Sequence, residues 1–488
     1  MHSILKTDHY KLTMAEAGWP LRNETFYYSH RHGGPHLLPF DVKDEIHKLN
    51  PFLNHSDISN ENDWLIKQNN TPFGAWFHGL RRQDFEFDIW APAKGSWIND
   101  RSPMFVVSGP SFAVSWLEPL VLQLNYIIQI ATMAVNNPLT LQKEVEVVTC
   151  DEQKQLILQT LENVADLGYN TPHVKIHINE EKYYSYVFKK VKSLIETVKD
   201  PLRIFEVGMR ATSCESQHII AVKAAKEAGL LITSDIWAAA NLGLKSSGTM
   251  GHEHVQRYGS DEAAYRAIIE RVPGSVFFLL DTFDTKKSGI PTAFKIISEQ
   301  PERKHAIRFD SGDIKQQFIF AAKLAQKMGI HPRFCLEDSW NLNKTIEFEN
   351  IRKNLGISAE QVLYGYGGYI INSPFTTITR DRVSAVWKLT QTGNIPTMKF
   401  GSSAGKGKES IPGKPILYWS KSNATIGQLN EDIQNMECAF SSDAKPIPHP
   451  KILNKTYNPC IYSPETKRLV NNLTDKRNKA IKEIRNVY

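Results

Sequence analysis

The segment RIFEV at residues 203–207 begins a series of six short runs that are rich in apolar and β-branched residues. The other five are LLITS (230–234), VFFLLD (276–281), HAIRFD (305–310), RFCLE (333–337) and VLYGY (362–366). Their starting points lie 27, 46, 29, 28 and 29 residues apart, which leaves room for one strand and one helix in each unit. The six runs therefore predict strands that alternate with helices.

The segments between these runs carry helical signals. Thr212 and Glu215 have the spacing of a capping box, and apolar side chains recur with helical periodicity at Ile314, Phe318, Ala321, Ala325 and Met328. Strands joined by helices form parallel sheets, and continuous apolar runs are typical of strands that are buried on both faces. We therefore predict an α/β fold, and the pattern leaves open whether the sheet is a barrel or doubly wound.

The rest of the chain extends on both sides of this region, and its 488 residues suffice for two or three domains. A long helix is predicted from about residue 118 to 134, after a region rich in aromatic and turn residues. Turns or linkers are predicted at GSSAGKGKESIPGK (401–414) and KPIPHP (445–450). We divide the chain into an N-terminal part with the linking helix (1–150), a catalytic barrel domain (151–395) and a C-terminal part (396–488).

Composition excludes several classes of protein. Hydrophobic residues make up 41% and charged residues 23%, as in ordinary folded proteins. Most of the net charge of +6 comes from residues 467–488, which we interpret as a solvated helix face and not as a nucleic-acid site. Five widely spaced cysteines indicate neither a disulfide framework nor zinc, and no apolar run is long enough to span a membrane. These features predict a cytoplasmic protein without nucleic-acid or membrane partners.

Polar residues follow the predicted strands directly. Ligands of parallel α/β folds bind at the carboxyl ends of the strands, so these residues are candidates for a site. They are Arg210, Asp235, Asp281, Asp284, Asp310, Ser311, Asp313, Asp338, Gly367 and Gly368. Carboxylates suit ribose hydroxyls or hydrated Mg²⁺, and adjacent glycines expose backbone N–H groups to a phosphate. The pattern predicts an enzyme of a sugar phosphate or a phosphorylated nucleotide.

One histidine stands out from the others. His252, in the segment GTMGHEH (248–254), occupies the ligand half of a strand–helix unit, where an imidazole can act as a base, an acid or a covalent phosphate carrier. A capping or core role is the alternative. The histidine-rich segment SHRHGGPH (29–36) lacks a carboxylate at ligand spacing, so we do not interpret it as a metal site.

A set of motifs, in this order, resembles the nicotinate phosphoribosyltransferase family and in part the nicotinamide phosphoribosyltransferases. The motifs are TDHYKLTMAEAG (7–18), FEVGMR (205–210), TSD (233–235), GTMGHE (248–253), LLDTFDT (279–285), RFDSGD (308–313) and GYGG (365–368). The resemblance covers residues 7 to about 370. It implies an irregular parallel α/β barrel of the type II phosphoribosyltransferases beside an α/β sandwich built from N- and C-terminal segments. It also implies a homodimer with shared active sites.

The implied reaction transfers the phosphoribosyl group of 5-phosphoribosyl-1-diphosphate to nicotinate, coupled to ATP hydrolysis, in NAD salvage. The resemblance implies that ATP transiently phosphorylates His252, and that Mg²⁺ arrives with the diphosphate and not at a fixed protein site. The resemblance also implies that Arg308, and Tyr10 from the partner subunit, contact the pyridine ring. It implies that Asp310 and Asp338 bind the ribose, and that Arg210, Gly367 and Gly368 bind phosphate groups. Diphosphate and Mg²⁺ are implied to be ordered by Asp281 and Asp284, and further substrate contacts to come from Ser311 and Asp313.

Three positions depart from the family pattern: Val207 replaces a usual phenylalanine, Ala211 a frequent arginine, and Asp235 the asparagine typical of nicotinate enzymes. If Asp235 faces the ring, its carboxylate accepts a hydrogen bond from an amide and repels a carboxylate, which favours nicotinamide. The other motif forms resemble the nicotinate branch. We therefore predict nicotinate as the acceptor, with nicotinamide as the alternative and another barrel enzyme of sugar phosphates as a further one.

Overall fold

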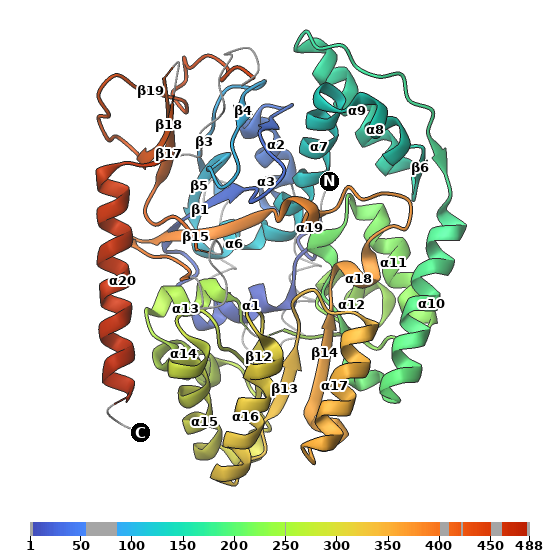
Figure 1. Ribbon diagram of the computed structural model, residues 1–488, viewed down its shortest axis with the longest axis vertical. Coiled ribbons are helices and arrows are strands. Elements are labelled where there is room, and N and C mark those ends of the chain that lie inside the picture. Colours follow the sequence, from blue (N-terminus) through green and yellow to red (C-terminus); the bar gives the residue numbers. More distant parts are fainter. Residues whose placement is uncertain are drawn as a thin grey trace.

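The computed structural model describes residues 3–54, 85–248, 250–400, 409–420, 423–449 and 461–485. Two units with separate hydrophobic cores make up most of it (Figure 1). Parallel strands occupy the lower half of Figure 1 and an antiparallel sheet the upper half. Within these ranges, no helix is both long and apolar enough to cross a membrane.

The lower unit contains a parallel sheet of seven strands in the order β10-β9-β8-β14-β13-β12-β11. All six predicted runs contain one of its strands. The strands are β8 (Ile204–Glu206), β9 (Ile232–Thr233), β10 (Lys245–Ser246), β11 (Phe277–Leu279), β12 (Ala306–Phe309), β13 (Arg333–Leu336) and β14 (Val362–Tyr366). The sheet curls into an incomplete barrel with β10 and β11 at its edges, which confirms the irregular α/β barrel.

Helices cover the outer face of this sheet. They are α10 (Glu180–Val198), α11 (Glu215–Glu227), α12 (Ile236–Leu242), α13 (His252–Tyr258), α14 (Asp261–Arg271), α15 (Ile290–Glu299), α16 (Ile314–Met328), α17 (Leu342–Asn354) and α18 (Gly368–Ile371). The predicted helical periodicity coincides with α16, in which Phe318 and Ala321 are fully buried and Met328 is exposed. Alternation of strand and helix along the chain thus produces the parallel sheet that the sequence predicts.

The predicted capping box at Thr212 and Glu215 is wrong. Helix α11 begins at Glu215 with Cys214 as its N-cap, so Glu215 is the first helical residue and not the third. The Thr212 hydroxyl donates instead to the Met209 carbonyl oxygen at 2.8 Å. At the N-terminus of α11 the hydrogen bond runs in the opposite direction along the chain: the Gln217 side chain accepts from the Ser213 N–H at 2.7 Å.

The upper unit has an antiparallel sheet in the order β16-β15-β1-β5-β3. Its strands come from both ends of the chain: β1 (Asn23–Ser29), β3 (Asp88–Trp90), β5 (Phe105–Pro110), β15 (Val386–Thr392) and β16 (Ile395–Pro396). The pairing of β1 with β15 joins segments more than 350 residues apart, as the resemblance implies for the sandwich. β15 precedes the predicted domain boundary at residue 395 although it lies in this sheet, and the boundary itself stays a prediction.

The predicted linking helix is α7 (Glu118–Asn136), which packs its apolar side chains against the antiparallel sheet. The remaining elements before the barrel are α1 (His9–Ala17), α2 (Val42–Leu49), α3 (Pro51–Asn54), α6 (Ser111–Trp116), α8 (Pro138–Glu144), α9 (Asp151–Asp166), β2 (His36–Leu37), β4 (Trp97–Ile98), β6 (Val147–Val148) and β7 (His177–Ile178). Helix α7 thus links the two units, since its contacts include the 3-10 turn Met209–Ala211 of the barrel.

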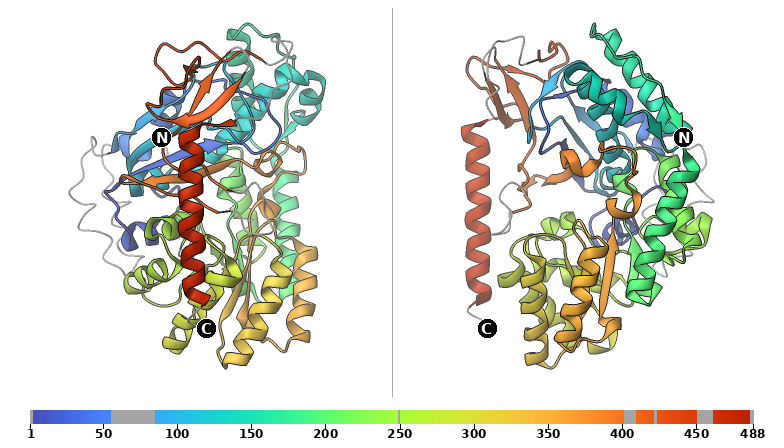
Figure 2. Two further views of the ribbon diagram at one scale, coloured as in Figure 1. Left: turned by 60° about the vertical axis from the view of Figure 1, so that its left-hand side comes forward. Right: turned by 45° about the vertical axis from the view of Figure 1, so that its right-hand side comes forward.

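The C-terminal part adds a small sheet in the order β19-β17-β18-β20 and one long helix. The elements are α19 (Arg380–Val383), β17 (Pro415–Trp419), β18 (Ala424–Gln428), β19 (Glu437–Cys438), β20 (Ile461–Tyr462) and α20 (Pro464–Arg485). Helix α20 carries the basic tail and runs along the outside of both units (Figure 2). Residues 401–408 of the predicted linker lie outside the described residues.

Candidate active site

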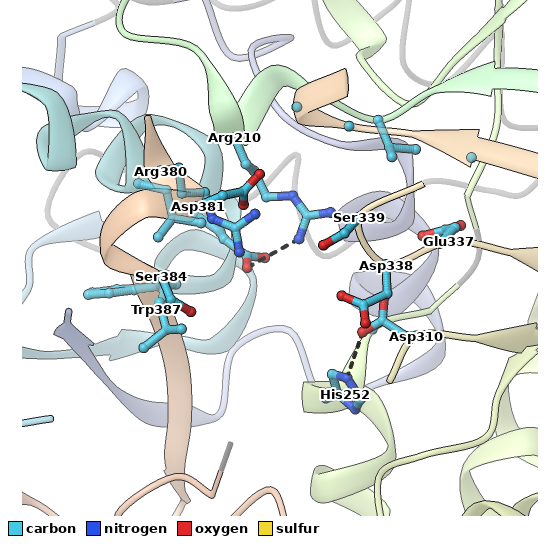
Figure 3. Close-up of a pocket in the computed structure, with 18 of the residues that line it drawn as sticks. Arg210, His252, Asp310, Glu337, Asp338, Ser339, Arg380, Asp381, Ser384 and Trp387 are labelled. Carbon is cyan, nitrogen blue, oxygen red and sulfur yellow. Dashed lines mark hydrogen bonds and ion pairs between the residues drawn. The ribbon is translucent and has the colours of Figure 1, made fainter. Parts of the chain in front are cut away.

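A cavity of about 640 Å³ lies where the carboxyl ends of the parallel strands face β15. Eight of the thirteen predicted site residues line it: Tyr10, Arg210, His252, Arg308, Asp310, Asp338, Gly367 and Gly368. Figure 3 shows Asp310, Asp338 and His252 on one side of the cavity and Arg380, Ser384 and Trp387 on the other. The strand ends and the antiparallel sheet therefore build one site together.

His252 is the first residue of α13 and points into this cavity. Its Nε2 lies 2.8 Å from Lys399 Nζ and 3.2 Å from Asp310 Oδ2, and its Nδ1 lies 3.1 Å from the Thr282 hydroxyl. Burial and then the Lys399 ammonium lower the pKa of His252 from its usual value, so the neutral imidazole is favoured. Because an ammonium only donates, Nε2 of the neutral imidazole accepts the hydrogen bond from Lys399.

Asp281 and Ser311 lie behind His252 and do not line the cavity. Asp281 is 2% exposed, accepts a hydrogen bond from the Ser311 hydroxyl, and lies 3.2 Å from Lys399 Nζ. Burial alone would raise the pKa of Asp281, but Lys399 and His252 lower it below the usual value. An ionised Asp281 therefore holds the Lys399 ammonium against His252.

Asp284 and Asp313 also lie outside the cavity, and each caps a helix. Asp284 accepts hydrogen bonds from the N–H groups of Lys286 and Lys287, and Asp313 accepts one from Gln316 at 3.0 Å. Short polar side chains at these positions satisfy N–H groups that lack partners in the first helical turn. The structure thus places both carboxylates in local capping roles.

Two arginines are held in the cavity by carboxylates. Arg308 lies 3.2 Å from Glu337 and 3.3 Å from Asp310. Burial would lower the pKa of Arg308, but these two carboxylates raise it above its usual value. Arg210 lies 3.3 Å from Asp8 and 3.5 Å from Glu118. Both guanidinium groups are therefore charged and fixed in place before any anion arrives.

Tyr10 lines the cavity of its own chain, where the resemblance implies a contribution from the partner subunit. Its hydroxyl donates to Glu118 at 2.9 Å, and its ring lies 5.6 Å from Arg210 Cζ. Burial would raise the pKa of Glu118, but Lys11 and Arg210 lower it below the usual value. Tyr10 and Arg210 are thus connected through one ionised carboxylate.

Sequence reasoning missed the positive residues that the antiparallel sheet and its neighbours contribute. They are Arg31, Arg380, Lys388 and Lys399. Arg31 lies within SHRHGGPH, which was considered only as a metal site, and the other three lie beyond the residues covered by the motifs. The basic character of SHRHGGPH was the available signal. With Arg210 and Arg308, these side chains make the cavity suited to an anion.

The backbone adds a further feature at the cavity. Asp338 and its neighbour Ser339 follow β13 with φ angles of 68° and 55°, a region that residues with a β-carbon rarely adopt. Two such residues in succession cost free energy, and strain of this kind concentrates at functional sites. A β-carbon on Gly368 would lie 2.8 Å from the Asn372 side chain and 2.9 Å from that of Asp381, so both side chains would have to shift.

Asp235 does not line the cavity. It is fully buried, accepts a hydrogen bond from the Trp237 N–H at 2.8 Å as the N-cap of α12, and lies 3.2 Å from His218 Nδ1. The argument for nicotinamide required that Asp235 face the ring. In this arrangement its carboxylate faces His218 instead.

One group of residues could hold a metal ion, although the sequence analysis predicts no fixed metal site. The ligand atoms of His252, Asp281 and Asp310 lie within 4.8 Å of one another. The Lys399 ammonium lies beside the same group, 2.8 Å from His252 and 3.2 Å from Asp281. A cation and Lys399 would therefore share these partners.

Solved structures share this fold. A putative nicotinate phosphoribosyltransferase from Saccharomyces cerevisiae matches with a TM-score of 0.57 and 19% identity, over 84% of this chain and 94% of that one. The nicotinate phosphoribosyltransferase from Porphyromonas gingivalis matches with a TM-score of 0.58 and 17% identity, over 84% and 96%. The chain thus has the α/β-barrel fold of the nicotinate phosphoribosyltransferases.

Proteins that are similar in sequence are also named nicotinate phosphoribosyltransferase. A nicotinate phosphoribosyltransferase from Bacillus subtilis is 27% identical over 248 residues, 49% of this chain and 48% of the relative. The one from Rattus norvegicus is 24% identical over 442 residues, 85% and 76%. The chain spans about half the length of the bacterial relatives it matches, and no family model matches it. The chain is similar in sequence to the nicotinate phosphoribosyltransferases, which confirms the resemblance predicted from the motifs.

Proposed function

We propose that this chain transfers the phosphoribosyl group of 5-phosphoribosyl-1-diphosphate to nicotinate, in NAD salvage, and couples the transfer to ATP hydrolysis through a phosphohistidine at His252. The arrangement at His252 carries this proposal: a neutral imidazole whose Nε2 accepts from Lys399 at 2.8 Å, in a cavity with two fixed arginines. The sequence relatives with this name support it.

The donor fits the cavity in three parts. Gly367 and Gly368 begin α18 and present backbone N–H groups to the 5′-phosphate. Asp310 and Asp338, at the ends of adjacent strands β12 and β13, accept hydrogen bonds from the ribose hydroxyls. The diphosphate lies against the positive residues on the opposite side of the cavity, which include Lys388 and Lys399.

The acceptor ring lies near the other end of the cavity, against Tyr10, Val207 and Arg308. A planar guanidinium stacks on an aromatic ring, so Arg308 replaces part of the contact that Val207 cannot supply. Its two carboxylate partners, Glu337 and Asp310, keep the guanidinium in place. The ring nitrogen is thereby oriented toward C1 of the ribose.

The chemistry requires positioning and charge stabilisation. Displacement of diphosphate from C1 builds positive charge on the ribose and negative charge on the leaving group. Ionised Asp310 faces the positive charge on the ribose, and the cationic side chains face the negative charge on the leaving diphosphate. Phosphorylation of His252 forms a bond from Nε2 to the γ-phosphorus of ATP and releases ADP, and Lys399 lies where it offsets the added negative charge.

Mg²⁺ fits the residues present. Asp281 Oδ1 is buried and has no hydrogen-bond partner among the described residues. It faces His252 Nε2 at 3.6 Å, and Asp310 lies next to it. Asp281 and Asp310 would hold the ion, since Mg²⁺ prefers carboxylate oxygens together with substrate phosphate. When bound, the ion supplies charge neutralisation for the diphosphate.

We also propose that the protein is a homodimer in the cytoplasm. Sedimentation equilibrium would test the homodimer.

Initial rates with nicotinate or nicotinamide, each with and without ATP, test the proposed function. With Mg²⁺ and 5-phosphoribosyl-1-diphosphate present, we expect mononucleotide from nicotinate, at a rate that ATP increases. Turnover of nicotinamide alone would contradict the acceptor assignment, and no turnover of either would favour another barrel enzyme of sugar phosphates. A rate from nicotinate that ATP leaves unchanged would contradict the coupling through His252.

The affinity for diphosphate is expected to fall as the pH rises through 7. Burial, then Lys399 and Arg31, lower the pKa of Lys388 to about 7, so this side chain is cationic below that pH and neutral above it. If diphosphate binds only when Lys388 is protonated, the affinity for diphosphate falls by up to about tenfold per pH unit above pH 7. Calorimetric titration of diphosphate from pH 6 to 8.5 measures this.

Two variants isolate the contribution of Lys388 from the ionisation of diphosphate itself. Lys388→Met should bind diphosphate more weakly than the wild-type protein at pH 6 and equally at pH 8.5. Lys323→Met, on the exposed face of α16, should follow the wild-type curve throughout. A constant ratio between wild type and Lys388→Met across this range would show that Lys388 does not titrate there.

A further inference from the structure

Three buried side chains form a charged cluster beside the cavity: Glu206, His218 and Asp235. Glu206 ends β8, His218 lies on α11, and Asp235 precedes α12. His218 Nδ1 lies 3.2 Å from Asp235 Oδ2, and His218 Nε2 lies 3.5 Å from Glu206 Oε1. None of the three residues is more than 1% exposed. An imidazole ring thus lies between two carboxylates out of contact with water.

At neutral pH the cluster contains the His218 imidazolium and an ionised Glu206. Burial would lower the pKa of His218, but Glu206 and Asp235 raise it to about 9. Burial would raise the pKa of Glu206, but His218 lowers it, with help from hydrogen bonds of Thr233 and Gly208. Tyr183 of α10 is a further titratable group close to Glu206, and its hydroxyl donates to the Ile371 carbonyl oxygen.

Asp235 connects the cluster to the N-terminal segment that carries Tyr10. The chain forms a bridge between Asp8 and Asp235, in which the His9 N–H donates to the Ser234 carbonyl oxygen at 2.7 Å and the Ile236 N–H donates to that of Thr7 at 3.1 Å. The Ser234 hydroxyl donates to Asp8 at 2.5 Å. This bridge sets the position at which α1 begins, and therefore the place of Tyr10.

Glu206 connects the cluster to Arg210. Its Oε1 accepts a hydrogen bond from the Gly208 N–H, which lies at the start of the turn that carries Arg210. Arg210 is in turn 3.3 Å from Asp8, which Ser234 holds. Two branches therefore lead from His218 to the same corner of the cavity, one through each carboxylate.

We propose that His218 is a positioning residue whose imidazolium holds Glu206 and Asp235, and through them Arg210 and Tyr10, in the geometry that binds the acceptor. Asp235 is thereby withheld from the acceptor and does not set the choice between nicotinate and nicotinamide. This proposal rests on the proposed function for its kinetic part only. The aspartate that departs from the family pattern is compensated within this chain by a buried histidine.

Kinetics of single and double variants test the positioning role. His218→Gln leaves two buried carboxylates without a cation, so we expect the KM for nicotinate to rise by about 10- to 100-fold, with a smaller change in kcat. In His218→Gln with Asp235→Asn the facing pair is neutral, and we expect most of the affinity to return. His331→Asn, an exposed histidine in the same domain, is the matched control. Additive effects in the double variant would overturn the proposal.

Asp235→Asn alone tests whether Asp235 contacts the acceptor. We expect an unchanged ratio of kcat/KM for nicotinate over nicotinamide, because this carboxylate faces His218. We also expect the rise in KM at high pH, near pH 9 in the wild-type protein, to begin at lower pH, because His218 has lost one carboxylate. A tenfold change in the acceptor ratio, or an unshifted pH profile, would overturn the proposal.

Thermal unfolding between pH 6 and 10 tests the charge on His218 independently of any turnover. A raised pKa in the folded state stabilises the protein fully below the unfolded value of about 6.5. That stabilisation is lost as the pH rises through about 9. The difference in Tm between wild type and His218→Gln should therefore shrink toward pH 10. A constant difference would overturn the charged state even if nicotinate is not the substrate, and Asp235→Asn serves the same test if His218→Gln does not fold.

Discussion

Replacing His252 with alanine is expected to abolish the acid-labile phosphate that ATP leaves on the protein and to remove the stimulation of turnover by ATP. The variant lacks the nitrogen that accepts from Lys399 at 2.8 Å and that would form the bond to the transferred phosphate. We expect the ATP-stimulated rate to fall by about 100-fold or more, with a slow uncoupled transfer left. Labelling with γ-phosphate-labelled ATP and initial rates measure the two effects.

His254 offers a matched control, because it lies two residues further along α13 and is also fully buried. Its Nε2 lies 2.9 Å from the Ala264 carbonyl oxygen, away from the cavity, and burial lowers its pKa to about 4. His254→Gln should therefore still be labelled by ATP. A label that persists in His252→Ala would assign the phosphorylated residue elsewhere.

Replacing Asp310 with alanine is expected to raise the KM for 5-phosphoribosyl-1-diphosphate by about 10- to 100-fold, the cost of removing a charged hydrogen-bond acceptor for the ribose hydroxyls. Burial would raise the pKa of this carboxyl, but Arg308, His252 and Lys399 hold it well below the usual value. Its negative charge is therefore present across the whole working pH range. Donor saturation curves at fixed nicotinate measure the change.

Asp313 offers a control that distinguishes the loss of a ribose contact from the loss of a negative charge in the same motif. Asp313 lies three residues further on and caps α16 by accepting from the Gln316 N–H at 3.0 Å. Asparagine keeps that hydrogen bond, so Asp313→Asn should leave the donor KM unchanged. A donor KM that is unchanged in Asp310→Ala would end the assignment of Asp310 to the ribose.

The parallel strands could be predicted because their signal is local. Apolar runs such as VFFLLD and VLYGY mark buried strands by composition alone, and the helix 314–328 follows from its periodicity. The seventh strand, Lys245–Ser246, was not predicted, since it has two residues and no apolar run. Whether the sheet forms a barrel or is doubly wound depends on strand order, which no local pattern contains.

The site could be predicted in part for a similar reason. Residues that directly follow a parallel strand reach one edge of the sheet whatever the details of packing, and this rule found Arg210, Asp310 and Asp338. The rule did not find Lys388 and Lys399, because Lys388 reaches the cavity from the antiparallel sheet and Lys399 from the segment that follows β16. Strand β15 joins the antiparallel sheet through its pairing with β1, between residues far apart in the chain.

The sequence by itself determined the strand and helix alternation, the polar strand ends and the motifs that relate this chain to the nicotinate phosphoribosyltransferases. These features depend on residues close together in the chain. Only the tertiary structure decided that Lys399 meets His252, that Asp284 and Asp313 cap helices, and that Asp235 turns toward His218. The direction of a side chain depends on which distant groups are buried with it, because a buried charge must find its partner wherever the fold places one.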